Sequence, residues 1–88
     1  MYYVYVLKSH KDRQMYIGYT VDLRRRIKEH ESGHVQSTKG RLPVELVYYE
    51  AFKYVRDAKA QELFYKTGQG RRILKARLKT VMEGCESG

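Results

Sequence analysis

The segment from Tyr16 to His30 changes from the pattern of a strand to that of a helix within a few residues. Its first four residues are aromatic or β-branched around Gly18, which is typical of a short strand with a tight bend or a close backbone approach. From Leu23 onwards, apolar side chains recur four positions apart, as on one face of a helix. A chain with this junction must combine a sheet with helices.

The three consecutive arginines of this helix are not equivalent. At 100° per residue, Leu23 and Ile27 form a buried stripe. Arg26 and His30 lie on the edge of that stripe, so we expect both side chains to face the sheet. The cations that turn towards water are Arg24, Arg25 and Lys28. A partly buried guanidinium needs a negative partner, and we expect no acidic residue one turn from Arg26 on this edge, so a bound phosphate would supply the missing charge.

Two strands are predicted before this helix, over Tyr2–Lys8 and Met15–Tyr19. A polar loop separates them, which favours an antiparallel hairpin. The alternation of side chains along the first strand puts Tyr3 and Tyr5 on one face and the valines on the other. In such a hairpin, the tyrosine pair lines the surface that Arg26 would reach.

One more strand and two more helices are predicted further along the chain. Val44–Phe52 is rich in Val, Tyr and Phe and predicts a third strand. Asp57 is placed to cap a helix over Ala58–Thr67, and the glycines that follow are expected to end it. A last helix is predicted over Arg71–Met82. The order ββαβαα predicts an α+β domain with a small three-stranded antiparallel sheet flanked by helices.

The chain of 88 residues is long enough for one small domain. We place that domain at residues 1–82 and expect residues 83–88 to form a disordered tail. The 18 lysines and arginines against 10 acidic residues give a net charge of +8. This excess favours a polyanionic partner over the alternative of a merely basic soluble protein.

Cysteine content and the amino-terminal segment bear on the cellular compartment. Cys85 is the single cysteine and cannot form an internal disulfide, which is consistent with a reducing interior. The apolar start over residues 2–7 is too short for a signal peptide, and no basic segment precedes it. We therefore expect a cytoplasmic protein with no membrane span.

Four sequence features, taken in order, resemble the GIY-YIG nuclease domain. They are the triplets Tyr3-Val4-Tyr5 and Tyr16-Ile17-Gly18, an arginine eight residues after that glycine, and a glutamate on a later helix. Each motif alone is weak, but the ordered set is specific. Tyr3 stands where the family name has glycine, although small stand-alone bacterial members commonly read Tyr-Val-Tyr there. The resemblance covers roughly residues 1–67 and is closest to those stand-alone members, which are similar to the amino-terminal catalytic domain of the bacterial nucleotide-excision-repair incision protein.

The resemblance implies a set of site residues, namely Tyr5, Tyr16, Arg26 and Glu62. Glu62 would bind one divalent cation, Mg²⁺ or Mn²⁺, and Arg26 would hold the phosphate oxygens through its planar guanidinium. Either Tyr5 or Tyr16 would take the proton of the attacking water, and the choice between them stays open. His30, one turn after Arg26, would orient the water or share the proton transfer.

Glu62 is placed by its context Glu62-Leu63-Phe64-Tyr65-Lys66, which is similar to the glutamate helix of the family. The expected apolar stripe of this helix consists of Ala60, Leu63, Phe64 and Thr67. Glu62 lies away from the centre of that stripe and one turn before Lys66. Two interpretations stay open. In the first, Glu62 forms a solvated ion pair with Lys66. In the second, the helix is covered on both sides and Glu62 faces the site.

Six basic residues are candidate contacts for a nucleic-acid backbone, on the loop before the third strand and on the last helix. They are Lys39, Arg41, Arg71, Arg72, Lys75 and Lys79. On the last helix the apolar stripe is expected to consist of Ile73, Leu74, Leu78 and Val81. The basic residues around it would track phosphates or simply solvate an amphipathic helix, and the sequence favours neither interpretation.

The resemblance as a whole predicts a metal-dependent endonuclease that hydrolyses DNA phosphodiester bonds, in repair or in the processing of damaged or branched DNA. One alternative is a catalytically silent nucleic-acid-binding module that keeps the fold. Another is a catalytic subunit that needs a protein targeting partner. Every motif residue is present, which favours the enzyme. The sequence does not distinguish DNA from RNA or identify the physiological metal.

Overall fold

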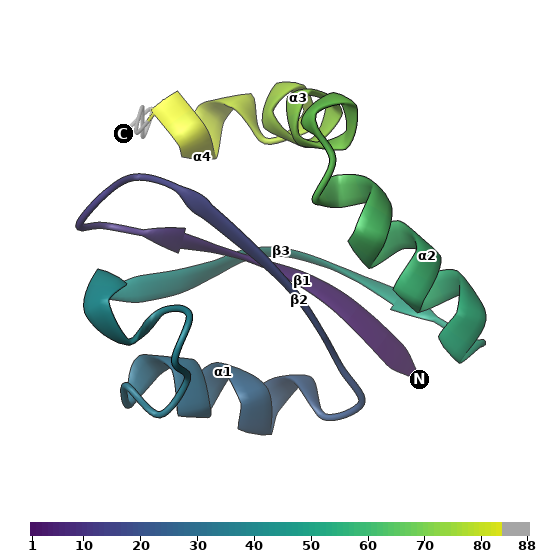
Figure 1. Ribbon diagram of the computed structural model, residues 1–88, viewed down its shortest axis with the longest axis horizontal. Coiled ribbons are helices and arrows are strands. Elements are labelled where there is room, and N and C mark those ends of the chain that lie inside the picture. The colour runs from purple at the N-terminus through teal and green to yellow at the C-terminus, as the bar shows by residue number, and fades with distance from the viewer. Residues whose placement is uncertain (84–88) are drawn as a thin grey trace.

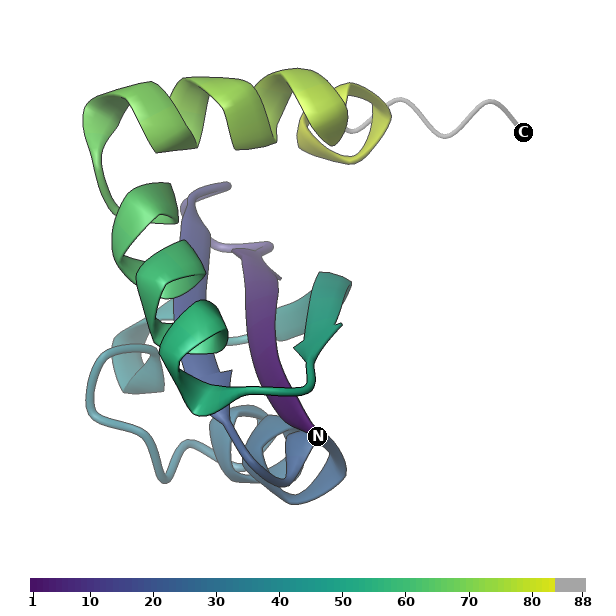
Figure 2. The ribbon, with the colours of Figure 1, turned by 90° about the vertical axis from the view of Figure 1, so that its right-hand side faces the viewer.

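The computed structural model describes residues 1–83 and consists of a sheet with helices on both faces (Figure 1). Helix α1 (Leu23–Glu31) lies on one face, and α2 (Val55–Tyr65), α3 (Gly68–Arg77) and α4 (Lys79–Glu83) lie on the other. In Figure 2, α2 runs alongside the strands and α1 lies at the bottom of the view. The predicted α+β class and the order ββαβαα are confirmed. Of the tail expected at residues 83–88, only Glu83 lies within the described residues.

The sheet consists of β1 (Tyr2–Ser9), β2 (Met15–Thr20) and β3 (Val44–Phe52), in the order β2-β1-β3. The central strand β1 pairs antiparallel with both neighbours. All three strands lie within one residue of the bounds predicted from the sequence. Because helices cover both faces, β1 is buried continuously from Val4 to Ser9.

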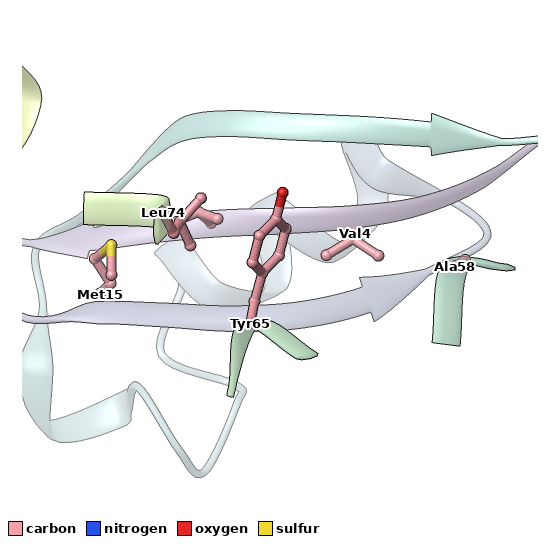
Figure 3. Packing of buried hydrophobic residues seen from close by; sticks show 6 residues of the cluster. Val4, Met15, Ala58, Tyr65 and Leu74 are labelled. Atoms are coloured by element: carbon pink, nitrogen blue, oxygen red, sulfur yellow. The ribbon is translucent and has the colours of Figure 1, made fainter. Parts of the chain in front are cut away.

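The alternation of side chains along β1 divides the interior into two clusters. The larger cluster, on the α2 side, consists of Val4, Val6, Met15, Ala58, Tyr65 and Leu74 (Figure 3). The smaller cluster, on the α1 side, is built around Tyr5, Leu7 and Val44. Burial of each large side chain contributes roughly 1.5–3 kcal/mol, so the strand stabilises both layers at once.

Asp22 caps the amino-terminal end of helix α1. Its side-chain Oδ1 accepts a hydrogen bond from the Arg25 amide at 3.1 Å. The helix ends just before Gly33, whose φ of 80° suits glycine. Arg25 is exposed, Arg26 is half-buried and His30 is only 3% exposed, as the helical phase predicts.

The boundaries of the later helices differ from those predicted. Helix α2 begins at Val55, so Asp57 lies within its first turn rather than capping it. Thr67 caps α3 by accepting a hydrogen bond from the Gly70 amide at 3.0 Å. The glycines therefore form the first turn of α3 instead of a break. A Cβ at Gly70 would overlap the Phe64 carbonyl, so glycine is needed for the two helices to meet this closely.

The last helix is divided at Leu78, whose ψ of 31° departs from helical geometry. The predicted single helix over residues 71–82 is therefore two helices, α3 and α4. Its stripe is only partly as predicted, because Leu74 is fully buried but Ile73 is 40% exposed. Within the described residues, no helix is both long and apolar enough to cross a membrane.

The apolar stripe predicted for α2 is wrong. Leu63 is 67% exposed, whereas Ala58 and Tyr65 are buried at 0% and 1% exposure. The Tyr65 hydroxyl donates to the Glu50 carboxylate of β3, and Gln61 donates to the same carboxylate at 3.0 Å. Because Glu50 provides a polar partner on the sheet, polar side chains of α2 face inwards, which hydrophobicity alone does not reveal. Glu62, next to Gln61, consequently lies on a sheltered side of the helix.

The segment between α1 and β3 is more ordered than the loop predicted there. It contains the short 3₁₀ helix η1 (Lys39–Arg41), preceded by two buried side chains, Val35 and Thr38. The Ser9 hydroxyl donates to the Arg41 carbonyl at 2.6 Å and so ties this segment to the end of β1. The segment thus packs against the sheet near α1.

Candidate active site

A cavity of about 440 Å³ lies where β2, α1 and the junction of α2 with α3 meet. Five residues predicted for catalysis or nucleic-acid binding line it, namely Tyr5, Tyr16, Arg26, His30 and Arg71. Lys66, which ends α2, also reaches this cavity. The structure therefore brings together side chains from β1, β2, α1 and the junction of α2 with α3.

Gly18 of the Tyr-Ile-Gly triplet leaves room for the Tyr5 side chain to reach the cavity. The two residues are directly opposite each other in the β1 and β2 pairing. A Cβ at Gly18 would overlap the end of the Tyr5 ring and its hydroxyl. The phenol thus crosses over bare backbone of β2. The two triplets of the motif are consequently one structural unit.

The Tyr5 hydroxyl is at the centre of a small hydrogen-bonded group. It lies 2.8 Å from His30 Nε2 and accepts from Arg26 Nε at 3.3 Å. Burial raises the pKa of Tyr5, and the hydrogen bond from Arg26 opposes this shift. Tyr5 is therefore a buried phenol whose oxygen is held beside a fixed positive charge.

Tyr3 does not belong to this group. Its ring packs edge-on against Tyr49 with ring centroids 6.1 Å apart, at a separate cavity of about 650 Å³ between α1 and β3. Two residues along a strand displace a side chain by roughly 7 Å, which is enough to separate Tyr3 from Arg26. Of the predicted tyrosine pair, only Tyr5 reaches the arginine.

Arg26 has an acidic neighbour that the sequence analysis wrongly excluded. Its Nη1 donates to Glu29 Oε1 at 3.1 Å, and Glu29 also pairs with Arg25 Nε at 3.4 Å. The carboxylate is shared because i, i+3 and i, i+4 neighbours both lie within reach on a helix. Within residues 1–83, Arg26 Nη2 has no hydrogen-bond partner. The guanidinium therefore keeps a donor for an incoming anion.

His30 is a buried neutral imidazole. Burial lowers its pKa to about 4, and the nearby charge of Arg26 acts in the same direction. Its Nδ1 lies 2.7 Å from the Thr38 hydroxyl and its Nε2 contacts Tyr5. Both ring nitrogens are engaged, so His30 is held in one orientation.

Tyr16 is bound to two groups that the sequence analysis did not connect with it. Its hydroxyl donates to Asp12 Oδ2 at 2.6 Å and accepts from Arg41 Nε at 3.0 Å. Burial raises the pKa of Tyr16, and the hydrogen bond to Asp12 raises it further. The phenol proton of Tyr16 is thus held by a carboxylate.

Asp12 and Thr38 are two site residues that the sequence does not predict, as are Glu29 and Lys66. Asp12 and Thr38 both lie in polar segments without hydrophobic periodicity. Asp12 precedes Tyr16 by four residues across the hairpin loop, and Ser9 shapes that loop by accepting from the Asp12 amide at 3.1 Å. A carboxylate close before a motif tyrosine was the available signal for Asp12. No comparable signal marked Thr38.

Glu62 lies beside the cavity rather than in its lining. Its side chain is 20% exposed and its Oε2 accepts from Lys66 Nζ at 3.1 Å. The ion pair that the sequence left open is therefore present. The pKa of Tyr5 is raised mainly by burial and to a smaller extent by the charge of Glu62, which places this carboxylate within electrostatic reach of the phenol.

The donor set near Glu62 fits a hydrated cation better than a dehydrated one. Among the side chains that the structure describes, no three metal-ligating groups cluster together. Mg²⁺ and Mn²⁺ are bound in many sites by one or two carboxylates, with water and substrate oxygens completing the shell. A single sheltered carboxylate such as Glu62 is compatible with that mode.

The predicted nucleic-acid contacts fall into two groups. Arg71 lines the cavity and donates to the Met15 carbonyl at 3.0 Å, while Arg41 is bonded to Tyr16. The others are exposed and do not line the cavity, and these are Lys39, Arg72, Lys75 and Lys79. Only the first group touches the candidate active site.

Comparison with known proteins agrees with this geometry. A family model described as the GIY-YIG catalytic domain matches residues 1–75. A UPF0213 protein of Clostridium perfringens is 46% identical over 67 residues, which cover 75% of this chain and 71% of that protein. UPF0213 proteins of Bacillus pumilus and Bacillus subtilis are 46% and 42% identical, over 75% and 74% of this chain and 67% and 66% of their own lengths.

The family model covers most of the chain, and the tyrosine, glycine and arginine of the family motifs meet at one cavity. GIY-YIG domains are nuclease domains. The chain therefore belongs to the GIY-YIG family, among its small UPF0213 members.

Proposed function

We propose that this chain is a divalent-metal-dependent endonuclease that hydrolyses DNA phosphodiester bonds in the cytoplasm, in repair or in the processing of damaged or branched DNA. The observation that carries the proposal is the direct bonding of Tyr5 to Arg26 and His30 at a cavity open to a substrate. The nuclease character of the family and the net charge of +8 support it.

Arg26 is assigned to the scissile phosphate. Its Nε is bonded to Tyr5 and its Nη1 to Glu29, which fixes the plane of the guanidinium. A preorganised charge of this kind stabilises the extra negative charge that develops on the phosphoryl oxygens. Arg71, on the other wall of the cavity, is assigned to a neighbouring phosphate of the same strand.

Tyr5 is assigned as the base and Tyr16 as a donor that supports the site. The proton of Tyr16 is held by Asp12, whereas the Tyr5 oxygen accepts from Arg26. Tyr5 first releases its phenol proton to solvent through the cavity. In the hydrolytic step an O–H bond of water then breaks and its proton passes to the Tyr5 phenolate. The water oxygen bonds to phosphorus as the bond from phosphorus to the leaving oxygen breaks, and the leaving oxygen takes a proton from solvent. Arg26 favours the phenolate that this step requires.

Glu62 is the residue assigned to the divalent cation. When bound, the cation would neutralise charge on the phosphate and on the leaving oxygen. Binding of the cation at Oε2 would require the Glu62 carboxylate to loosen its ion pair with Lys66. Lys66 lines the cavity, so its freed ammonium would still face the phosphate.

The test is a nuclease assay on supercoiled plasmid, single-stranded DNA, branched DNA and RNA, with Mg²⁺, Mn²⁺ or EDTA. We expect cleavage of at least one DNA substrate with either metal and none with EDTA. Binding of DNA without cleavage of any substrate would support the silent module instead. Cleavage that appears only when a second protein is added would identify a subunit with a targeting partner.

A further inference from the structure

Thr38 is a buried threonine for which the proposed mechanism has no role so far. It belongs to the segment between α1 and β3, its relative exposure is 0%, and its hydroxyl lies 2.7 Å from His30 Nδ1. Within residues 1–83, this imidazole nitrogen is the hydrogen-bond partner of the hydroxyl. A series of hydrogen-bond contacts therefore runs from Thr38 through His30 to Tyr5.

The number of hydrogen atoms that Thr38, His30 and Tyr5 carry decides which atom donates each hydrogen bond between them. The Thr38 hydroxyl carries one hydrogen, and a buried donor that finds no acceptor is costly. His30 Nδ1 is the acceptor within reach, so the threonine donates to it and Nδ1 carries no proton. A neutral imidazole then has its hydrogen on Nε2, which faces the Tyr5 oxygen at 2.8 Å.

We propose that Thr38 is a positioning residue that fixes the tautomer of His30 and thereby makes the Tyr5 oxygen the acceptor of two hydrogen bonds, from His30 Nε2 and Arg26 Nε. The catalytic meaning of this assignment rests on the proposed function, whereas the tautomer itself does not. Two donors on one phenol oxygen turn its own hydrogen away from both, into the cavity that Tyr5 lines, where solvent is its acceptor. The same two donors stabilise the phenolate once that proton has left.

The opposite tautomer would produce a different site. With the proton on Nδ1, His30 Nε2 would accept the Tyr5 hydrogen and hold it inside the protein. The Tyr5 oxygen would lose one of its two donors, and the Thr38 hydrogen would have no acceptor within residues 1–83. The two arrangements therefore differ in which nitrogen of one histidine carries a proton, and this can be measured directly.

The first experiment is a long-range ¹H–¹⁵N correlation spectrum of the full chain at neutral pH, which separates protonated from unprotonated ring nitrogens. We expect an unprotonated Nδ1 and a protonated Nε2 for His30. The assignment comes from the spectrum of a His30→Gln variant, in which that pair of signals disappears. An unprotonated Nε2 in the parent protein would overturn the proposal, whatever the nuclease assay shows.

The second experiment compares Thr38→Val, which keeps the shape of the side chain but removes the hydroxyl, with Thr38→Ser, which keeps the hydroxyl. We expect Thr38→Val to shift the tautomer of His30 and to lower kcat about ten- to a hundredfold with little change in KM, the usual cost of losing the partner that orients a histidine. Thr38→Ser is expected to keep the parent tautomer and to recover most of the rate. Thr80→Val, at an exposed threonine of α4, is the matched control.

These measurements test the tautomer of His30 separately from the proposed nuclease function. If the parent protein cleaves no nucleic acid, its tautomer spectrum still decides the role of Thr38. If Thr38→Val shifts the tautomer but cleaves as fast as the parent protein, the positioning role is wrong even though the nuclease assignment stands. If Thr38→Val fails to fold, Thr38→Ser and the parent spectrum remain as tests, and a His30 tautomer in Thr38→Ser that differs from the parent would contradict the proposal.

Discussion

Gly18 and Tyr5 show how a residue without a side chain contributes to a site. The Tyr5 ring passes over Gly18 to reach Arg26 and His30, so the backbone of β2 forms part of the wall around the phenol. At this scale, the properties of the site follow from a few atoms. Three predictions concern single side chains.

Replacing Gly18 by alanine is expected to displace Tyr5, because the new Cβ would overlap the end of its ring. Strain of this kind in a packed interior costs roughly 1–3 kcal/mol. Urea denaturation should show this loss, and nuclease activity should fall with it. Gly40→Ala is the control, because no atom lies within 4 Å of a Cβ built at Gly40. Equal stability of the two variants would show that the Tyr5 ring can move aside freely.

Arg26→Ala is expected to lower cleavage about a hundred- to a thousandfold, the loss that follows when one preorganised charge leaves a developing oxyanion. Arg25→Ala should behave nearly like the parent protein, since Arg25 is exposed and outside the cavity. Both variants remove one charge and one partner of Glu29, so the comparison isolates the position of the guanidinium. Single-turnover rates measure it, and equal rates would refute the assignment of Arg26.

Glu62→Gln is expected to abolish metal-dependent turnover while preserving the fold, because the amide keeps the shape of the side chain but binds a hard cation weakly. Lys66→Met is the companion variant, since it removes the ammonium that pairs with Glu62. It should lower the Mg²⁺ concentration needed for half-maximal activity if the cation and Lys66 compete for one carboxylate. An unchanged activity of Glu62→Gln would place the cation elsewhere.

At the scale of helices and strands, an element is predictable from the sequence where its local residue pattern is strong. The strands are predicted within a residue because runs of aromatic and β-branched residues stand between polar segments, and the phase of α1 is correct because Leu23 and Ile27 define it. The face of α2 was wrong because Tyr65 and Gln61 are held inwards by Glu50, a partner that only the tertiary structure supplies.

The candidate site was likewise predictable only where its residues lie on regular helices and strands. Tyr5, Arg26 and His30 lie on elements with a regular period, so their meeting could be inferred from the sequence. Asp12 and Thr38 lie in irregular segments, where the backbone path is set by long-range contacts such as the bond from Ser9 to Arg41. The position of Asp12 shortly before a motif tyrosine is the one sequence signal for either residue, and the contribution of Thr38 could not be inferred without the fold.

The exposed cations of α3 and α4 provide a prediction at the scale of an element. Neutralising Arg72, Lys75 and Lys79 together should reduce the slope of log affinity against log salt concentration by about three units on duplex DNA, because each phosphate contact releases close to one counterion. Binding titrations at several salt concentrations measure the slope. An unchanged slope would show that this surface does not contact the nucleic acid and only solvates the helices.

At the scale of the whole molecule, the buried His30 couples stability to pH. Its pKa is about 4 in the folded state against 6.5 as the ordinary value, mainly because of burial. Above pH 6.5 both states are neutral and the stability is fully present. As the pH falls from 6.5 towards 4, the unfolded state binds a proton that the folded state does not, so stability is lost by about 1.4 kcal/mol per pH unit.

Urea denaturation at pH 7 and pH 4.5 measures this effect, with His30→Gln as the control. The parent protein is expected to lose roughly 3 kcal/mol over this interval, and the variant should lose much less. The carboxylates whose pKa values are lowered in the folded protein, such as Glu29 and Glu50, titrate below this window and add little to it. Equal losses in both proteins would show that His30 takes up a proton without unfolding.

The two-sided burial of β1 has a consequence for redesigning this domain. Val4 and Val6 pack in the interior beneath α2, and Tyr5 and Leu7 pack in the layer on the α1 side. Deleting or inserting one residue within β1 would exchange the two sets, so that a valine would occupy the position of Tyr5 and the phenol would be buried in the apolar cluster beneath α2. The length of this strand is therefore fixed by both layers at once, because no shift of one residue can satisfy one layer without disrupting the other.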